Sequence, residues 1–214
     1  MMLRRSVLAV FLAFFAAVAS GVPARADPDV PVLLVVGDSI SAAHGLVAGQ
    51  GWVDLLASRL RSERYAHRVV NASITGDTTA GGRARFASLL AQHKPAVVVI
   101  ELGGNDGLRG GNLKSARENL DTMVTLARRA GAKVLLVGMK LPPNYGPAYT
   151  REFDAMFEAV GKAQKVPVVP YFFAGFGENN DFFQPDRIHP TAAAQPMLLD
   201  NVWPALKPLL GKPR

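Results

Sequence analysis

The chain has 214 residues, of which 49% are hydrophobic and 19% charged, with a formal net charge of +7 and no cysteine. The absence of cysteine excludes a thiol nucleophile, a disulfide framework and cysteine-based zinc sites. The positive charge is scattered without blocks of like sign, so we expect no nucleic-acid partner.

The N-terminus, residues 1–26, is predicted to be a cleaved signal peptide. Two arginines precede an almost unbroken apolar segment over 6–21, and Ala24-Arg25-Ala26 forms a small-x-small cleavage site. An uncleaved membrane anchor is the alternative, because the apolar segment is nearly long enough to span a bilayer. Cleavage after Ala26 removes three arginines and lowers the net charge from +7 to +4. We then expect 27–214 to be one domain, a periplasmic or secreted monomer without stable membrane insertion.

Strand and helix patterns alternate along the rest of the chain. Val- and Leu-rich runs without polar alternation are typical of strands buried on both faces of a parallel sheet. Such runs predict strands at 32–37, 67–73, 95–102, 133–138 and 166–169. Helical spacing predicts helices at 52–60, 80–92, 113–130, 150–163 and after the loop 171–190 through about 206. Five alternations predict a three-layer α/β/α fold with a five-stranded parallel sheet. By analogy we expect the flavodoxin-like strand order 2-1-3-4-5.

Three turns at the carboxyl ends of predicted strands carry polar residues that are suited to chemistry. They contain Ser39, Gly76 and Asn105. Because the carboxyl ends of parallel strands lie at one edge of the sheet, where ligands bind, we expect the three turns to meet. Each also has a simple structural explanation, since Asp, Ser, Gly and Asn are common turn formers. Gly-Asp-Ser alone is therefore a weak signal.

A possible base for a serine nucleophile lies near the C-terminus, in Asp186-Arg187-Ile188-His189-Pro190. Imidazole has a suitable pKa to accept the serine proton. An aspartate three residues earlier is close enough to fix the tautomer of the ring and to stabilise the imidazolium. The alternative is a surface histidine beside a turn-forming aspartate.

The other three histidines have simpler explanations. His44 lies in the loop after Ser39, where it can line a pocket, and His67 opens a predicted strand. His93 ends a predicted helix, where a cation interacts favourably with the helix dipole. None forms a metal-ligand pattern with its neighbours, so we expect no metal.

Acyl transfer also needs donors directed at the oxyanion that develops on the substrate. Gly76 can bring its N–H close to a ligand because it has no side chain, and Asn105 can donate from its amide. Gly103 and Gly104 allow the strand end to approach the nucleophile closely. Ordinary turn chemistry again remains an alternative for each residue.

Together these stretches resemble the SGNH (GDSL-type) hydrolase superfamily, which is named for its Ser, Gly, Asn and His. The matching blocks are residues 37–41, 71–79, 101–110 and 186–190, with Ile40 where the family more often has Leu. Residues 141–146, Leu-Pro-Pro-Asn-Tyr-Gly, resemble the subgroup of periplasmic multifunctional thioesterase, lysophospholipase and arylesterase enzymes. The resemblance extends from about Val32 to the last predicted helix.

The resemblance implies Ser39 as nucleophile, His189 as general base and then acid, and Asp186 as its orienting partner. It implies an oxyanion hole formed by the N–H groups of Ser39 and Gly76 and the amide of Asn105. No cofactor is implied. The expected activity is that of a serine esterase on small-molecule aryl or alkyl esters, with acyl thioesters or lysophospholipids as a wider scope.

Four apolar side chains near the motifs are candidates for an acyl-binding wall that suits short or medium acyl groups: Leu46, Leu108, Leu141 and Tyr145. Two other functions remain open. A carbohydrate-ester deacetylase needs a polar, aromatic-rich groove, which is not evident near the motifs. A non-catalytic binding module is expected to have lost at least one residue of the constellation, and all are present.

Overall fold

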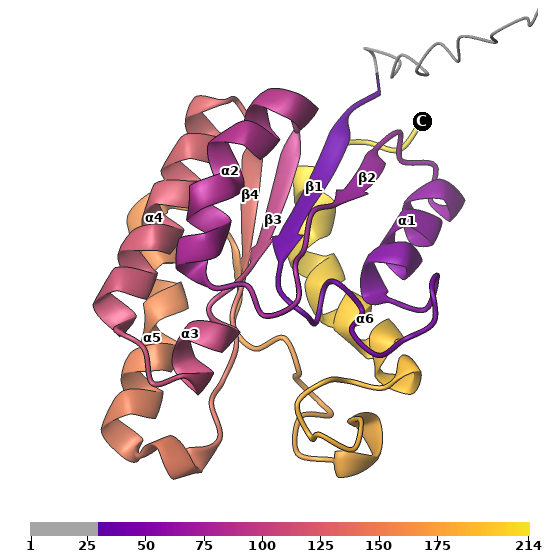
Figure 1. The fold of residues 1–214 in the computed structure, drawn as a ribbon. Coiled ribbons are helices and arrows are strands. Elements are labelled where there is room, and N and C mark those ends of the chain that lie inside the picture. The colour runs from indigo at the N-terminus through magenta and orange to yellow at the C-terminus, as the bar shows by residue number, and fades with distance from the viewer. Residues whose placement is uncertain (1–29) are drawn as a thin grey trace, which may run out of the picture.

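The computed structural model describes residues 30–214, so the predicted signal peptide and its cleavage site lie outside the described residues. Five parallel strands form one sheet: β1 (Val32–Gly37), β2 (Arg68–Asn71), β3 (Val97–Glu101), β4 (Lys133–Val137) and β5 (Val168–Val169). The strand order is β2-β1-β3-β4-β5 (Figure 1). The predicted parallel sheet and its flavodoxin-like order are therefore confirmed.

Helices cover both faces of the sheet, which confirms the three-layer prediction (Figure 1). One face packs against α1 (Trp52–Ser62) and α6 (Gln195–Leu206). The other face packs against α2 (Thr79–His93), α4 (Leu113–Arg129) and α5 (Pro147–Gln164). A single-turn helix, α3 (Gly104–Leu108), follows β3, and four short 3-10 helices lie at η1 (Pro143–Tyr145), η2 (Asn180–Phe182), η3 (Ala192–Ala194) and η4 (Lys207–Leu209).

Alternate residues of the central strands enter two separate hydrophobic cores. In β1, Leu33 and Val35 face the α1/α6 core, whereas Leu34 and Val36 face the core under α2, α4 and α5. All four side chains are fully buried. A strand that is buried on both faces needs apolar residues at every position, which explains why β1 lacks polar alternation.

The predicted boundaries differ from the structure where local and tertiary effects compete. The helix predicted at 150–163 begins earlier, at Pro147, because proline is well accommodated in the first turn of a helix. The strands after β1 are shorter than predicted, and the last spans only Val168–Val169. The helix α3 was not predicted, because its glycine-rich sequence has low helix propensity. Gly107 of α3 packs so tightly that a Cβ there would lie 2.5 Å from Phe153 and 2.9 Å from Leu141.

Between residues 30 and 214, no helix is both long enough and apolar enough to cross a membrane.

Candidate active site

The three predicted turns meet at the carboxyl edge of the sheet. The first, residues 37–41, follows β1 and is called the nucleophile turn below. The backbone N–H of Ile74 donates to the Gly37 carbonyl (3.0 Å), which holds the turn after β2 against it. Asn105 lies in α3, directly after β3, and its amide Nδ2 donates to Asp38 Oδ2 (3.1 Å) and to the Asp77 carbonyl (3.0 Å). The expected juxtaposition is therefore present.

A continuous hydrogen-bonded relay joins the nucleophile turn to the loop before α6. Ser39 Oγ lies 2.9 Å from His189 Nε2, and His189 Nδ1 lies 2.7 Å from Asp186 Oδ2. Ser39 and His189 are 150 residues apart in the sequence. The sheet topology brings them to the same edge, because both lie beyond the carboxyl ends of the strands. The geometry suits proton transfer from the serine hydroxyl to the imidazole.

Asp186 is held as a carboxylate by its own loop. Its Oδ1 accepts the backbone N–H groups of Ile188 (2.9 Å) and His189 (3.0 Å). Partial burial raises the pKa of Asp186, but hydrogen bonds from the His189 backbone, the His189 ring and the Ile188 backbone outweigh it and bring the pKa to about 2. Arg187 takes up positive φ (+59°), which closes this tight turn. Asp186 is thus a fixed acceptor for one ring nitrogen of His189.

Two glutamines that were not predicted as site residues anchor the loop that contains Asp186 and His189, called the histidine loop below. Gln184 Nε2 donates to the carbonyls of His44 (2.8 Å) and Pro190 (3.2 Å). Gln195, 1% exposed, accepts from the Trp52 backbone N–H (2.9 Å) through Oε1. Its Nε2 donates to the Thr191 carbonyl at 3.2 Å. These bonds tie the histidine loop to the segment that follows the nucleophile turn. Only their position beside a predicted motif distinguishes these glutamines in the sequence.

The placement of His44 agrees with its predicted position near the site. Its ring lies against that of His189, with the centroids 4.5 Å apart and the planes tilted by 47°. His44 thus restricts one side of the His189 ring.

Asn105 and Gly76 are placed together, as an oxyanion hole requires. The Asp77 carbonyl that accepts from Asn105 belongs to the residue directly after Gly76. Gly76 has a φ of +79°, a conformation that favours glycine, and Arg109 Nη2 donates to its carbonyl at 3.0 Å. Both Nδ2 hydrogens of Asn105 are already bonded to protein acceptors. Donation to a substrate oxygen therefore requires one of these bonds to be shared or broken.

Asp38, next to the serine, is a buried carboxyl whose role the sequence analysis did not foresee. Burial raises its pKa to about 6, despite the opposing effects of the Ile40 N–H, the His189 charge and the Asn105 amide. Its Oδ1 accepts from the Ile40 backbone N–H (3.0 Å), while Oδ2 accepts from Asn105. Asp38 thus joins the serine turn to the predicted oxyanion donor.

The predicted acyl-binding residues divide into two groups. Leu108, Leu141 and Tyr145 lie together around α3: Tyr145 Oη donates to the Leu108 carbonyl (2.8 Å), and Leu141 packs beside Gly107. Leu141 is only 9% exposed and belongs to the core under α2, α4 and α5. Leu46 lies apart from them in sequence, in the loop that follows the nucleophile turn, and is half-buried.

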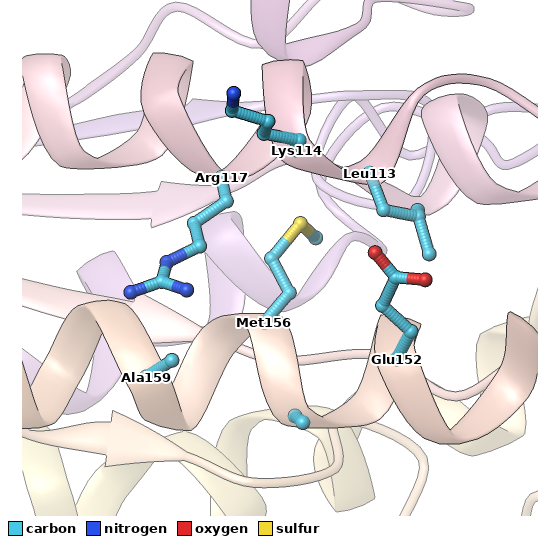
Figure 2. Close-up of a pocket in the computed structure, with 7 residues that line it drawn as sticks. Leu113, Lys114, Arg117, Glu152, Met156 and Ala159 are labelled. Carbon is cyan, nitrogen blue, oxygen red and sulfur yellow. The ribbon is translucent and has the colours of Figure 1, made fainter.

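A separate groove runs between α4 and α5 (Figure 2). Its lining residues are Leu113, Lys114, Arg117, Glu152, Ala155, Met156 and Ala159. It contains neither the serine nor the histidine of the relay, so it is not the site of the serine chemistry. Within residues 30–214, no three His, Asp or Glu side chains cluster in a way that suits a metal ion.

A serine that is bonded to a histidine–aspartate pair is the constellation of a serine hydrolase. In this chain it stands on a parallel sheet, and the Gly-x-Ser-x-Gly elbow of α/β-hydrolases is absent, since Ser41 occupies the position of the last glycine. Comparison with known proteins identifies the family. A model of the GDSL-like lipase/acylhydrolase family matches residues 35–195. The chain belongs to this family, which confirms the predicted resemblance.

Individual relatives cover most of the chain. Esterase TesA of Pseudomonas aeruginosa is 60% identical over 178 residues, which are 83% of this chain and 89% of TesA. A crystal structure of TesA superposes with a TM-score of 0.82 at 59% identity, and covers 84% of this chain and 99% of that one. Thioesterase 1/protease 1/lysophospholipase L1 of Escherichia coli is 39% identical and covers 84% of this chain and 85% of its own. The chain is a carboxylic-ester hydrolase that acts on small-molecule esters.

Proposed function

We propose that the protein hydrolyses its esters through a covalent acyl-enzyme on Ser39. The observation that carries this proposal is the relay from Ser39 Oγ to His189 Nε2 (2.9 Å) and from His189 Nδ1 to Asp186 Oδ2 (2.7 Å). A serine hydroxyl is a weak nucleophile by itself and needs an adjacent base, which this relay supplies.

In the acylation step, Ser39 Oγ attacks the carbonyl carbon of the ester while its proton passes to His189 Nε2. Asp186 keeps the other proton of the ring on Nδ1 and stabilises the imidazolium that forms. When the tetrahedral intermediate collapses, the bond to the leaving oxygen or sulfur breaks. His189 Nε2 gives its proton to that atom, and the alcohol or thiol departs.

The oxyanion is stabilised by the N–H groups of Ser39 and Gly76 and by the amide of Asn105. Asn105 Nδ2 is held in place by Asp38 Oδ2 and the Asp77 carbonyl, so it is already fixed before substrate binds. A negatively charged oxygen competes better than a neutral carbonyl for the hydrogen that now bonds Asp77. Its donation therefore strengthens as charge develops, which is the requirement for transition-state stabilisation.

In the deacylation step, water takes the place of the departed alcohol or thiol. His189 Nε2 accepts a proton from the water as its oxygen attacks the acyl carbon. The bond to Ser39 Oγ then breaks, Oγ regains the proton from His189, and the carboxylic acid leaves. The chain's own residues thus complete the cycle without a cofactor.

We extend the substrates from simple esters to acyl thioesters and lysophospholipids. The names of the relatives, which include a thioesterase and a lysophospholipase, support this range. So does the apolar group of Leu108, Leu141 and Tyr145, which would accompany the acyl chain beside α3. Both substrate classes present an acyl carbonyl with a leaving group that His189 can protonate.

We further propose that residues 1–26 are a signal peptide, that 27–214 form one domain, and that the mature protein is a periplasmic or secreted monomer. The basic n-region, the apolar segment and the Ala-x-Ala pattern support this. N-terminal sequencing of the protein after export from a Gram-negative host should begin at Asp27. An intact leader on the exported protein would overturn the cleavage, and a dimeric mass in solution would overturn the monomer.

The proposed reaction is tested with p-nitrophenyl esters of increasing acyl length. We expect measurable turnover by the purified protein, and loss of it to the background rate in Ser39→Ala. The matched control is Ser58→Ala, an exposed serine of α1, which should keep full activity. Equal activity of Ser39→Ala and the control would exclude Ser39 as the nucleophile. Turnover of acyl thioesters and lysophospholipids by the same pair of variants then defines the scope.

A further inference from the structure

Glu101 is a buried acid beneath the nucleophile turn that the catalytic cycle of Ser39 does not use. It is the last residue of β3, after four apolar residues, and is 3% exposed. Its Oε2 accepts from Ser41 Oγ at 2.7 Å. A Cβ added to Gly37 would lie 2.7 Å from that same Oε2 atom. The carboxyl group therefore fills the space directly under the turn, between its first and last residues.

Two further hydrogen bonds fix the turn beside this carboxyl group. Trp52 Nε1 donates to Ser41 Oγ (3.1 Å), and Asn71 Nδ2 donates to the Ser41 carbonyl (2.7 Å). The backbone N–H groups of Asp38 and Ser41 also lie near enough to the Glu101 carboxyl group to lower its pKa. Glu101 is thus bonded to the turn at Ser41 and packed beneath it at Gly37, on either side of the catalytic serine.

Stability alone does not explain an acid at this position. A buried carboxyl group loses its hydration, and an apolar side chain of similar volume often gives an equal or more stable fold. We propose that Glu101 is a positioning residue for the Ser39 reaction, an inference that rests on the proposed function. By bonding Ser41 at one end of the nucleophile turn and filling the space beneath Gly37 at the other, it directs Ser39 Oγ toward His189 and the Ser39 N–H toward the oxyanion.

The surroundings of Glu101 favour the uncharged form of its carboxyl group. Burial, and then the charge of Asp38, raise the pKa of Glu101 well above its ordinary value, and the bonds from Ser41 and the backbone only partly oppose them. Asp38 is the charged group that faces Glu101 from the turn, and Asp38 itself interacts with His189 and Asp77. Glutamine keeps an acceptor oxygen without a charge. Glutamine at position 101 should therefore preserve activity, whereas leucine should lower it.

The test compares Glu101→Leu, Glu101→Gln and Ser41→Ala on a p-nitrophenyl ester. In Glu101→Leu we expect kcat to fall by roughly 10- to 100-fold with KM changed by less than about twofold, because a misplaced nucleophile costs rate rather than binding. Glu101→Gln should stay within about threefold of wild type in kcat. Met123→Ala is the matched control: it destabilises the distant α4 core and should leave kcat unchanged.

Ser41→Ala gives an independent arm if Glu101→Leu does not fold. It removes the hydroxyl that bridges Glu101 and Trp52 with little change of volume, and we expect a several-fold lower kcat, roughly that of one lost hydrogen bond. In the double variant Ser41→Ala/Glu101→Leu, the Ser41 change should slow kcat less than it does in wild type, because the bond between Ser41 and Glu101 is already lost in Glu101→Leu and only the bond from Trp52 remains to be removed.

The dependence of stability on pH provides a second readout. Because its pKa is raised on folding, Glu101 favours the folded state fully below about pH 4.3, and that contribution is lost as the pH rises toward the folded value. Glu101→Gln does not titrate, so its Tm relative to wild type should increase from pH 4 to pH 8.

Three results would overturn the proposal. The first is a folded Glu101→Leu or Ser41→Ala with wild-type kcat. The second is Glu101→Gln as slow as Glu101→Leu, and the third is a Tm difference between Glu101→Gln and wild type that does not change with pH. The Ser39→Ala variant separates these results from a failure of the proposed reaction. Residual activity in Ser39→Ala refutes the reaction itself. The Glu101 variants are compared only in the part of the turnover that Ser39→Ala abolishes.

Discussion

Replacing Asp186 by asparagine tests the orienting role of this residue with little disturbance of the loop. Asparagine keeps the Oδ1 acceptor for the backbone N–H groups of Ile188 and His189, so the turn should remain folded. It replaces Oδ2, which lies 2.7 Å from His189 Nδ1, with an amide NH₂ group that can only donate a hydrogen bond. The ring must then accept at Nδ1 and carry its proton on Nε2, which faces Ser39. His189 can no longer take the serine proton.

We expect kcat of Asp186→Asn to fall by about 10³- to 10⁴-fold, as a wrong tautomer does in the serine-protease triad, which is about 4–5.5 kcal/mol in the barrier. The assay is hydrolysis of p-nitrophenyl acetate at pH 7, with circular dichroism to confirm the fold. Asp181→Asn, an exposed aspartate of η2, is the matched control and should retain wild-type kcat. If folded Asp186→Asn turns over within tenfold of this control, Asp186 does not set the tautomer of His189.

Three further predictions concern the oxyanion hole and the stability of the site. Asn105→Ala should lower kcat by roughly a hundredfold or more, and an unchanged kcat would show that another donor serves the oxyanion. Gly76→Ala should lower both the Tm and kcat, because alanine is strained at a φ of +79°. Wild-type values for both would refute the role of the Gly76 N–H as a donor to the oxyanion. The pKa of Asp186, about 2, lies below its ordinary value of about 3.9, so its carboxylate stabilises the fold above that pH, and this contribution is lost as the pH falls toward 2. Wild type should therefore lose Tm more steeply than Asp186→Asn between pH 4 and pH 2, and parallel curves would contradict the assignment.

The fold was predictable because its central strands are buried on both faces. The apolar runs of β1 and β3 contain only residues that such burial requires, so their positions were evident from the sequence. At the sheet edge the pattern is less exact: the run at 166–169 predicted a strand, but only Val168–Val169 form β5. In α3, Gly107 packs against Phe153, a tertiary contact that local helix propensity does not express.

The candidate site was predictable where several motifs shared one edge of the sheet. Ser39, Gly76 and Asn105 each follow a strand, so their meeting is a consequence of topology. The bonds that hold the site rigid were not predictable. Gln195 and Gln184 form hydrogen bonds with backbone groups that are far away in the sequence. Which backbone groups they meet depends on the path of the loops, which the sequence pattern does not specify. Glu101 offers the one visible signal, an acid at the end of an otherwise apolar strand.

The most direct test of the Ser39 acyl-enzyme is to trap the nucleophile with a p-nitrophenyl phosphonate ester, which acylating serines attack but release very slowly. Intact-mass and peptide mass spectrometry should show one phosphonyl group per chain, on the peptide that contains Ser39, with release of one p-nitrophenolate. Ser39→Ala should remain unlabelled and inactive. A label on any other residue, or labelling and turnover that persist in Ser39→Ala, would contradict the acyl-enzyme mechanism.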